Sequence, residues 1–257
     1  MYCYNYFLVE SRTSTPGDGE IVYCVVVEGT AKGTAFAIGD DLLLTAYHVC
    51  GGTGASISIC TSLERDGNDY ATTELKNVSI FEFDENEDWA ILKLESQRKK
   101  FTKWGQVCPE SELPDIRDTV GIRDFPVDML TSGSMNELQV GSSGPTKVAG
   151  YESRISPPNS PSGSNHVQKK VKLVKRLSKT VKDAIKVDTG RTGGSCGAPY
   201  FECNGGKVVA FHERSINDAA FDDDSVSWHS HHSKCIGFVL CRLPQFWDWY
   251  TNMKPAK

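Results

Sequence analysis

One cysteine, one histidine and one aspartate of this chain are candidates for nucleophilic catalysis. Cys196 stands among small residues in the segment 193–201 (GGSCGAPYF), a setting typical of a nucleophile on a tight turn before an apolar strand. His48 follows the apolar run at 42–44, and Asp88 directly precedes another apolar segment. A histidine within hydrogen-bond reach can take a thiol proton and leave a competent nucleophile, and a carboxylate can orient the ring. The three residue types therefore predict a nucleophilic thiol with its own base.

The order of these residues along the chain adds to this interpretation. Histidine, aspartate and then nucleophile is one of three unrelated orders in which such a triad occurs. It is the order of the chymotrypsin-fold peptidases, which the chain resembles from about residue 20 to about residue 243. The segment 194–199 (GSCGAP) is similar to their Gly-x-Ser-Gly-Gly-Pro pattern, so Cys196 and not Ser195 aligns with the nucleophile. Cysteine at this position makes the chain resemble the picornain-type and potyvirus-type viral proteases.

Acyl transfer gives each member of the triad a role. Cys196 is predicted to attack the substrate carbonyl, while His48 takes the thiol proton and later protonates the leaving amine. Asp88 is predicted to hold the imidazole in the useful tautomer and to stabilise the imidazolium. A thiolate–imidazolium pair depends less on the carboxylate than a serine does. Loss of Asp88 is therefore expected to cost less activity than loss of His48.

The glycines beside Cys196 predict an oxyanion hole. A tetrahedral intermediate needs two backbone N–H groups aimed at the developing oxyanion, and glycine permits the unusual backbone path that this requires. We assign these donors to Gly194 and Cys196. Gly197 and Ala198 are expected to keep the turn narrow, so that the next strand carries Pro199 back into the barrel.

A second histidine predicts the substrate preference. His212 lies 16 residues after Cys196, and in the viral proteases that the chain resembles a histidine at about this spacing lines the pocket for the residue before the scissile bond. A neutral imidazole that donates to a side-chain oxygen selects glutamine or glutamate. Ala210 replaces the glycine usual in those proteases. Thr192 or Arg191 is the candidate for a second polar contact in this pocket.

Short apolar segments separated by turn residues predict strands throughout the chain. Six of them precede residue 96, as suits a small antiparallel barrel, at 21–27, 33–38, 42–44, 56–60, 78–81 and 90–94. A second series follows at 119–122, 138–140, 147–151, 185–187, 200–202, 208–211 and 236–240. The segment 243–250 contains an early proline and several aromatic residues, which predicts a short helix packed on the body.

The predicted fold is all-β, with two antiparallel chymotrypsin-like β-barrels and a short C-terminal helix. Residues 18–100 are expected to form the N-terminal barrel with the histidine and the aspartate, and 101–117 the connection between the barrels. Residues 118–243 are expected to form the C-terminal barrel, which carries the cysteine and the substrate pocket. Residues 244–257 complete the chain as helix and tail.

The segment 157–186 fits this pattern least well. Its start, 157–165, is rich in proline, serine and glycine, which predicts a flexible surface loop. From Lys169 to Lys186, eight basic residues stand against the single acid Asp183. Apolar residues recur there at helical spacing: Val171, Val174, Leu177, Val181 and Ile185. Contact with RNA or an anionic membrane surface stays open, but charge runs more often solvate than recognise, so a solvated basic face is favoured.

The nine cysteines are odd in number and include no Cys-x-x-Cys pair, which argues against a disulfide framework or a structural zinc site. We expect a reducing compartment, where a free thiol nucleophile survives, and we expect the other eight cysteines to be small buried hydrophobes. His229, His231, His232 and Cys235 have no second ligand cluster near them in sequence. No metal and no cofactor is therefore predicted.

Length and composition are those of an ordinary soluble globular protein, with 257 residues, 39% hydrophobic and 24% charged. No apolar run reaches the roughly 18 residues of a membrane helix, and residues 1–6 lack the basic start and apolar core of a signal peptide. We expect no membrane span and an intracellular location, which is the host cytoplasm if the chain is viral.

Together these patterns predict a cysteine endopeptidase that cleaves polypeptides through an acyl-thioenzyme, with viral polyprotein processing as the first interpretation. A cellular trypsin-like or HtrA-type peptidase is the alternative within the same class, because residues 187–189 (VDT) resemble the sequence before the nucleophile of those enzymes. A different class also stays open, in which the fold is a catalytically silent binding module with a basic RNA-binding segment. The oligomeric state is not predicted.

Overall fold

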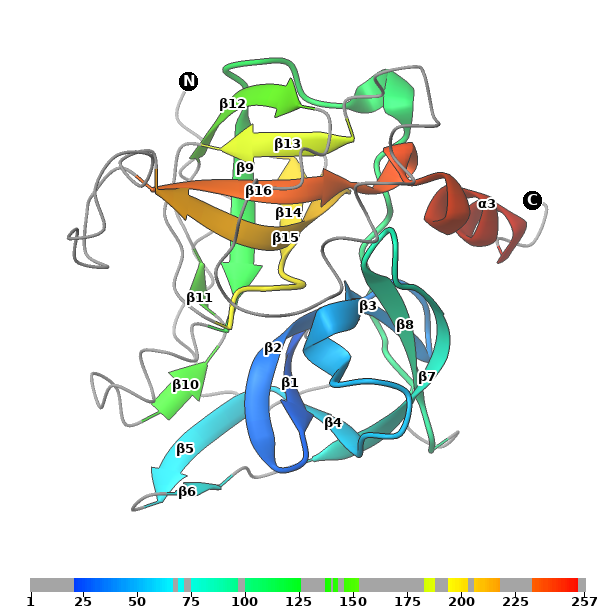
Figure 1. Ribbon diagram of the computed structural model, residues 1–257, viewed down its shortest axis with the longest axis vertical. Helices are drawn as coiled ribbons and strands as arrows, with labels where there is room; N and C mark the ends of the chain where they lie inside the picture. Colours follow the sequence, from blue (N-terminus) through cyan, green and yellow to red (C-terminus); the bar gives the residue numbers. More distant parts are fainter. Residues whose placement is uncertain are drawn as a thin grey trace.

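Two β-barrels and one C-terminal helix make up the fold (Figure 1). The computed structural model describes residues 21–66, 69–71, 75–96, 100–125, 137–139, 141–142, 146–152, 183–187, 194–202, 206–217 and 233–253. Within these ranges every strand pair of the two barrels is antiparallel, so each barrel is built from hairpins and short connections. The predicted all-β, two-barrel fold is confirmed.

The first barrel closes in the strand order β1-β2-β3-β8-β7-β4. Its strands are β1 (Val22–Val27), β2 (Thr30–Ala37), β3 (Leu42–Ala46), β4 (Ile57–Cys60), β7 (Lys76–Asp84) and β8 (Trp89–Leu94). A 3-10 turn, η2 (Tyr47–Cys50), follows β3 directly. All residues of β1 and β3 are buried, because one face of each strand fills the barrel and the other packs against the surrounding chain.

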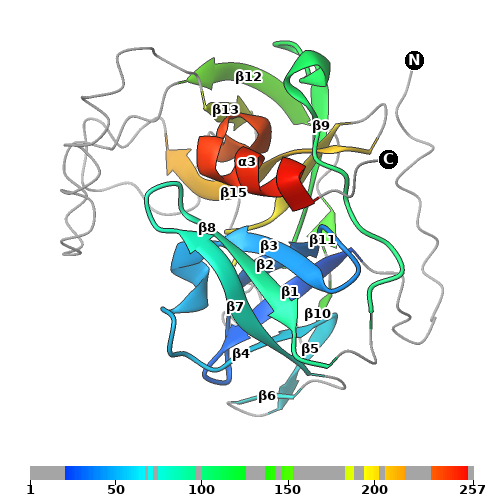
Figure 2. The ribbon, with the colours of Figure 1, turned by 90° about the vertical axis from the view of Figure 1, so that its right-hand side faces the viewer.

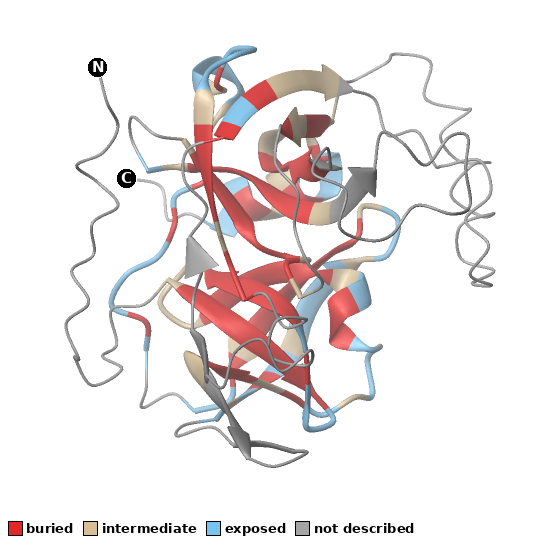
Figure 3. Cartoon of the chain, turned by 90° about the vertical axis from the view of Figure 1, so that its left-hand side faces the viewer, coloured by how far each residue is buried: buried red, intermediate tan, exposed pale blue. Residues whose placement is uncertain are grey.

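The second barrel contains β9 (Thr119–Asp124), β12 (Thr146–Glu152), β13 (Ala184–Val187), β14 (Pro199–Glu202), β15 (Val208–Asn217) and β16 (Ser233–Val239). Its strands follow the order β9-β12-β13-β16-β15-β14, and the pairing of β14 with β9 closes it. The two-residue strand β11 (Gly141–Ser142) extends the sheet beside β9. Figure 3 shows the buried residues filling both barrels and the region between them.

The C-terminal helix α3 (Pro244–Met253) follows the short turn η4 (Leu240–Arg242). Its buried residues are Phe246 and Tyr250. The Phe246 ring meets the indole of Trp89 edge-on, with 5.8 Å between ring centroids, and Trp89 begins β8 of the first barrel. The helix therefore joins the end of the chain to the first barrel, beside the β7–β8 hairpin (Figure 2).

Three strands differ from the predicted pattern. The segment expected at 138–140 as part of the second barrel is instead β10 (Glu137–Gln139), which pairs with β5 (Ser62–Asp66). With β6 (Asp69–Ala71) these form a separate small sheet of order β10-β5-β6. The sequence did not predict β5 and β6 because they are polar and carry no clear alternation.

The basic segment is described only at its end. Ile185 was predicted both in a strand and in a helical pattern; it lies in β13, so the strand is correct and the helix does not reach this residue. Residues 153–182 lie outside the described part, and the predicted loop and basic face there stay predictions, as do the predicted domain boundaries. Among the helices of the described ranges, none has the length and apolar character required to cross a membrane.

Candidate active site

His48 and Asp88 meet because the strands next to them are paired. β3 pairs with β8, with Ala46 opposite Trp89, so the residues just beyond these positions come together. The His48 Nδ1 lies 2.8 Å from Asp88 Oδ2, and the His48 backbone N–H donates to Asp88 Oδ1 at 3.1 Å. The Tyr47 N–H donates to the Asp88 carbonyl at 3.1 Å. The carboxylate thus holds both the ring and the backbone of His48.

Asp88 occupies a strained position that its neighbours hold in place. Its φ is +57°, in the left-handed region that a non-glycine residue seldom adopts. The Glu87 carboxylate accepts the Trp89 indole N–H at 3.0 Å and the N–H groups of Gln245 and Phe246 at 3.3 Å. Those two amides are at the start of α3, where a negative charge is favourable. The C-terminal helix therefore fixes both residues that flank Asp88.

Cys196 faces His48 from the second barrel, on a turn that leads into β14. Its thiol interacts with the His48 ring and acts to raise the pKa of the ring, while the sulfur donates to the Glu213 carbonyl at 3.3 Å. Burial of the His48 ring acts to lower its pKa, but the side chain is 47% exposed. The hydrogen bonds and charges of Asp88 and Cys196 outweigh burial and raise the pKa of His48 to about 10.

Ser195, the neighbour of Cys196, is turned to a different partner. Its hydroxyl donates to Asp124 Oδ2 at 2.5 Å, and both residues are buried, at 0% and 1% exposure. Of the two adjacent side chains that could act as a nucleophile, it is Cys196 that interacts with the His48 ring. The alignment of Cys196 with the nucleophile agrees with this geometry.

The backbone of the turn needs glycine at two positions. Gly194 has φ +92° and Gly197 has φ +85°. A Cβ on Gly197 would lie 2.1 Å from the Thr34 carbonyl oxygen, so no other residue fits there. Gly194 and Cys196, the predicted oxyanion donors, both lie in this turn; their role stays a prediction.

Thr34 on β2 holds the turn from the first barrel. Its N–H donates to the Cys196 carbonyl at 2.9 Å, and its hydroxyl donates to the Gly194 carbonyl at 2.9 Å. The Thr45 hydroxyl in turn donates to the Thr34 carbonyl at 2.8 Å. No sequence signal marked Thr34, because threonine is common in strands and its partners are 160 residues away.

His212 lies on β15 and is buried, with 2% exposure. Its Nδ1 is 2.8 Å from the Tyr200 hydroxyl, a partner that the sequence analysis did not identify. Gly237 is opposite His212 on β16, and a Cβ there would lie 2.8 Å from the Tyr200 ring. At this exposure, substrate reaches His212 only if neighbouring residues move. Arg191 and Thr192, the other predicted pocket residues, lie outside the described part.

The other described cysteines have surroundings that make them inert. Burial, followed by the negative charge of Asp88, raises the pKa of the Cys50 thiol to about 12. Burial also raises the pKa of Cys108 to about 11 and of Cys241 to about 12. The described cysteines are all free: Cys24, Cys50, Cys60, Cys108 and Cys235 are buried, and Cys196 and Cys241 are half-buried. Cys241 thus corrects the expectation of burial, while Cys3 and Cys203 lie outside the described part.

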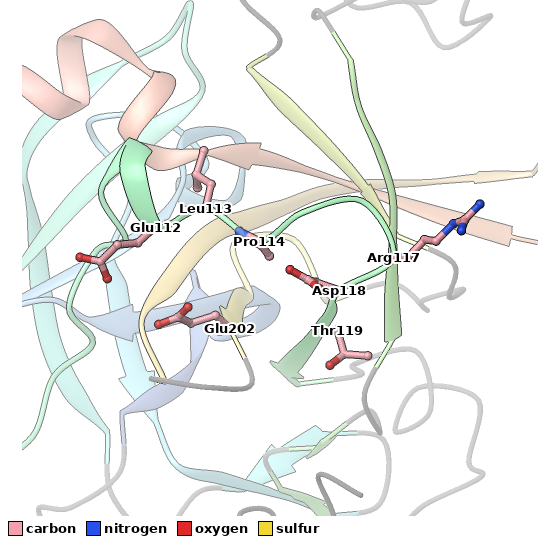
Figure 4. Close-up of a pocket in the computed structure, with 7 residues that line it drawn as sticks. All are labelled: Glu112, Leu113, Pro114, Arg117, Asp118, Thr119 and Glu202. Carbon is pink, nitrogen blue, oxygen red and sulfur yellow. The ribbon is translucent and has the colours of Figure 1, made fainter. Parts of the chain in front are cut away.

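The described residues place no metal-binding group at the triad, and the cavity described below lies elsewhere. Among the described residues, no group of three or more histidine, cysteine, aspartate or glutamate side chains is arranged to hold a metal ion, and His229, His231 and His232 lie outside them. A cavity of about 310 Å³ is lined by other residues: Glu112, Leu113, Pro114, Arg117, Asp118, Thr119 and Glu202 (Figure 4). It contains none of the triad, so the thiol site is not this cavity.

A match to a known protein family agrees with the two-barrel fold. The family model of the trypsin-like peptidase domain matches residues 33–211, which include all three members of the triad. The chain belongs to this trypsin-like peptidase family. No curated protein sequence is similar enough to the chain to count as a match.

Several solved structures share the fold. The active form of the Rv3671c protease from M. tuberculosis is 14% identical, with a TM-score of 0.54, and the match covers 92% of this chain and 83% of that one. The MamO protease domain from Magnetospirillum magneticum is 9% identical, with a TM-score of 0.54 and coverage of 91% and 96%. Deg5 is 16% identical, with a TM-score of 0.50 and coverage of 77% and 80%. At these identities the likeness shows the fold alone.

Proposed function

We propose that this trypsin-like peptidase is a cysteine endopeptidase whose nucleophile is Cys196. The observation that carries the proposal is the position of the His48 ring, which bonds Asp88 and interacts with the Cys196 thiol so that the pKa of the ring is raised. The adjacent hydroxyl of Ser195 is buried and bonded to Asp124, so it is unsuited to attack a substrate. Substrate positioning, a base and a nucleophile are the parts that acyl transfer requires.

The reaction follows from this arrangement. The Cys196 thiol first passes its proton to His48; the resulting thiolate attacks the scissile carbonyl carbon, and the carbonyl oxygen becomes an oxyanion. The backbone N–H groups of Gly194 and Cys196 donate to that oxyanion. The intermediate collapses when His48 returns the proton to the leaving amine, which leaves a thioester on Cys196. Water activated by His48 then hydrolyses the thioester and restores the thiol.

The electrostatics of the pair favour a thiol over a hydroxyl nucleophile. The raised pKa of His48 keeps the ring protonated at neutral pH. A positive ring beside sulfur stabilises the thiolate, which is the reactive form of cysteine.

We further propose that His212 selects glutamine or glutamate before the scissile bond. A Tyr200 hydroxyl that donates to Nδ1 places the ring proton of His212 on Nε2. Nε2 then carries a proton that a side-chain amide or carboxylate oxygen can accept, which is the contact that selects glutamine or glutamate.

Replacing Tyr200 by phenylalanine is expected to weaken this selection. The change removes the hydroxyl that sets the tautomer of His212, so the preference in kcat/KM for glutamine over leucine is expected to fall by roughly tenfold. Tyr151→Phe is the matched control, because the Tyr151 hydroxyl donates to the Pro114 carbonyl at 2.6 Å, in the same barrel. A preference that is unchanged in Tyr200→Phe would remove Tyr200 from the pocket.

The structural matches change the balance between the two origins considered for the enzyme. Cys196 and His212 favoured viral polyprotein processing in the sequence. The matches with a stated organism come from M. tuberculosis and Magnetospirillum magneticum, which supports the cellular alternative better than the viral one. In either case we propose a polypeptide substrate and a reducing compartment, in which the thiol stays free.

The test is cleavage of a diverse peptide library under reducing conditions, read by mass spectrometry, with a parallel sample alkylated by iodoacetamide. Cuts after glutamine or glutamate that disappear on alkylation would support both the thiol mechanism and the role of His212. Cuts after other residues would still support the peptidase function but would reject the proposed role of His212 in selecting glutamine or glutamate. Cuts that survive complete alkylation of Cys196, or no cuts by folded protein, would reject the cysteine mechanism.

A further inference from the structure

The nucleophile turn, residues 194–197, is bonded to three strands from two barrels. On β2, Thr34 bonds the carbonyls of Gly194 and Cys196, as described above. On β15, the His212 carbonyl accepts the Gly197 N–H at 2.8 Å. The third contact comes from the end of β9, where the Asp124 carboxylate accepts the hydroxyl of Ser195.

This third contact is a buried carboxylate–hydroxyl pair. Asp124 is 1% exposed and Ser195 is 0% exposed, and 2.5 Å separates Oδ2 from Oγ. A carboxylate in the protein interior is costly unless it is hydrogen-bonded, and hydrogen bonds to a charged acceptor are among the stronger ones. The hydroxyl partner of this carboxylate belongs to Ser195, which directly precedes the proposed nucleophile Cys196.

The residue after Asp124 strengthens the same link. The Phe125 N–H donates to the Thr34 hydroxyl at 3.1 Å, and that hydroxyl donates to the Gly194 carbonyl. The end of β9 therefore reaches Ser195 directly and Gly194 through Thr34. Gly194 has no side chain to restrict its backbone, so its orientation depends on bonds of this kind.

We propose that Asp124 is a positioning residue for the oxyanion hole. Its carboxylate touches no reacting atom; by holding Ser195 it keeps the turn in the conformation in which Gly194 and Cys196 present their N–H groups to the oxyanion. This inference rests on the proposed peptidase function. Because the oxyanion exists in the transition state and not in the bound substrate, loss of the link lowers kcat and leaves KM nearly unchanged.

The experiment compares Ser195→Ala, Asp124→Asn and the double variant. Ser195→Ala removes the bond, and kcat is expected to fall by about 100-fold, as on loss of one oxyanion donor. In Asp124→Asn, kcat is expected to fall only roughly tenfold, because the amide oxygen can still accept a weaker hydrogen bond from Ser195. The double variant is expected to resemble Ser195→Ala, since both changes remove one interaction. Alkylation of Cys196 forms no oxyanion and is expected to keep its rate.

Thr146→Val is the matched control for disturbing the second barrel. Thr146 is buried on β12 opposite Val120 of β9, and its hydroxyl has no hydrogen-bond partner within the described part of the chain. This variant is expected to keep the wild-type kcat. If Ser195→Ala keeps the wild-type kcat, Asp124 does not position the oxyanion hole. The same conclusion follows if Ser195→Ala slows the alkylation of Cys196 as much as it slows cleavage.

Amide hydrogen exchange separates this inference from the proposed function. In Asp124→Asn, faster exchange confined to residues 194–198 is expected, and this readout does not depend on cleavage. If the wild-type protein cleaves no peptide, the peptidase proposal fails, while local loosening of the turn would still support the link through Asp124. Unchanged exchange in the turn would reject the link even if the enzyme is active.

Discussion

Replacement of Cys196 by alanine is expected to lower kcat/KM for peptide cleavage by at least about 10⁵-fold, to the level of background hydrolysis. The alanine side chain cannot form the thioester, and the neighbouring hydroxyl of Ser195 is no substitute, because it is buried and bonded to Asp124. The measurement is steady-state cleavage of the best library peptide, with folding checked by thermal denaturation.

Cys241→Ala is the control for this experiment. Cys241 is also a half-buried free thiol, but it bonds Glu110 at 3.4 Å, away from the triad, and its raised pKa keeps it protonated at neutral pH. Its removal is expected to leave cleavage unchanged. Residual activity of Cys196→Ala above a few per cent of the wild type would show that another group is the nucleophile.

The second large effect is expected at His48. His48→Ala removes the base and the proton donor for the leaving amine, and kcat/KM is expected to fall by roughly 10⁴-fold or more. In Asp88→Ala, kcat/KM is expected to fall by roughly 10²-fold, because the Cys196 thiolate still pairs with the ring when the carboxylate is lost. Equal losses in the two variants would indicate a mechanism that depends on Asp88 as strongly as serine triads do.

The raised pKa of His48 also predicts that the stability of the fold depends on pH. A group with a higher pKa in the folded than in the unfolded protein stabilises the fold below the unfolded pKa, and this stabilisation is lost as pH rises through the folded pKa. For His48 the window runs from about 6.5 to about 10. In Asp88→Ala the stability difference between these pH values, measured by urea denaturation, is expected to shrink. Asp41→Ala is the control, since Asp41 pairs with Lys93 on the surface and does not contact His48.

The fold and the triad could be read from the sequence because local patterns carry them. Apolar runs such as 42–44 and 90–94 predict strands without knowledge of their partners, and the order of the triad restricts the fold class. The pairing of β3 with β8, which brings His48 to Asp88, was implied by the resemblance and not by the runs themselves. The predicted roles of the site residues stay predictions until activity is measured.

The supports of the site could not be read in this way because they depend on contacts between distant segments. Ser195 and Asp124 are 71 residues apart, and Glu87 meets the start of α3 across 158 residues. Serine and aspartate at such positions give no periodic signal, and a buried carboxylate looks in sequence like a surface one. The pairing of β10 with β5 was missed for the same reason, since a three-residue strand does not specify its partner.

The C-terminal helix affects the order in which the surroundings of Asp88 are assembled during synthesis. A chain grows from its N-terminus, so the first barrel, with His48 and Asp88, can fold before α3 exists. Glu87 and Trp89 receive their helix contacts only when residues 244–250 have emerged, and until then the strained backbone of Asp88 lacks part of its support. The two residues that flank Asp88 therefore reach their final contacts only after the helix segment has been synthesised.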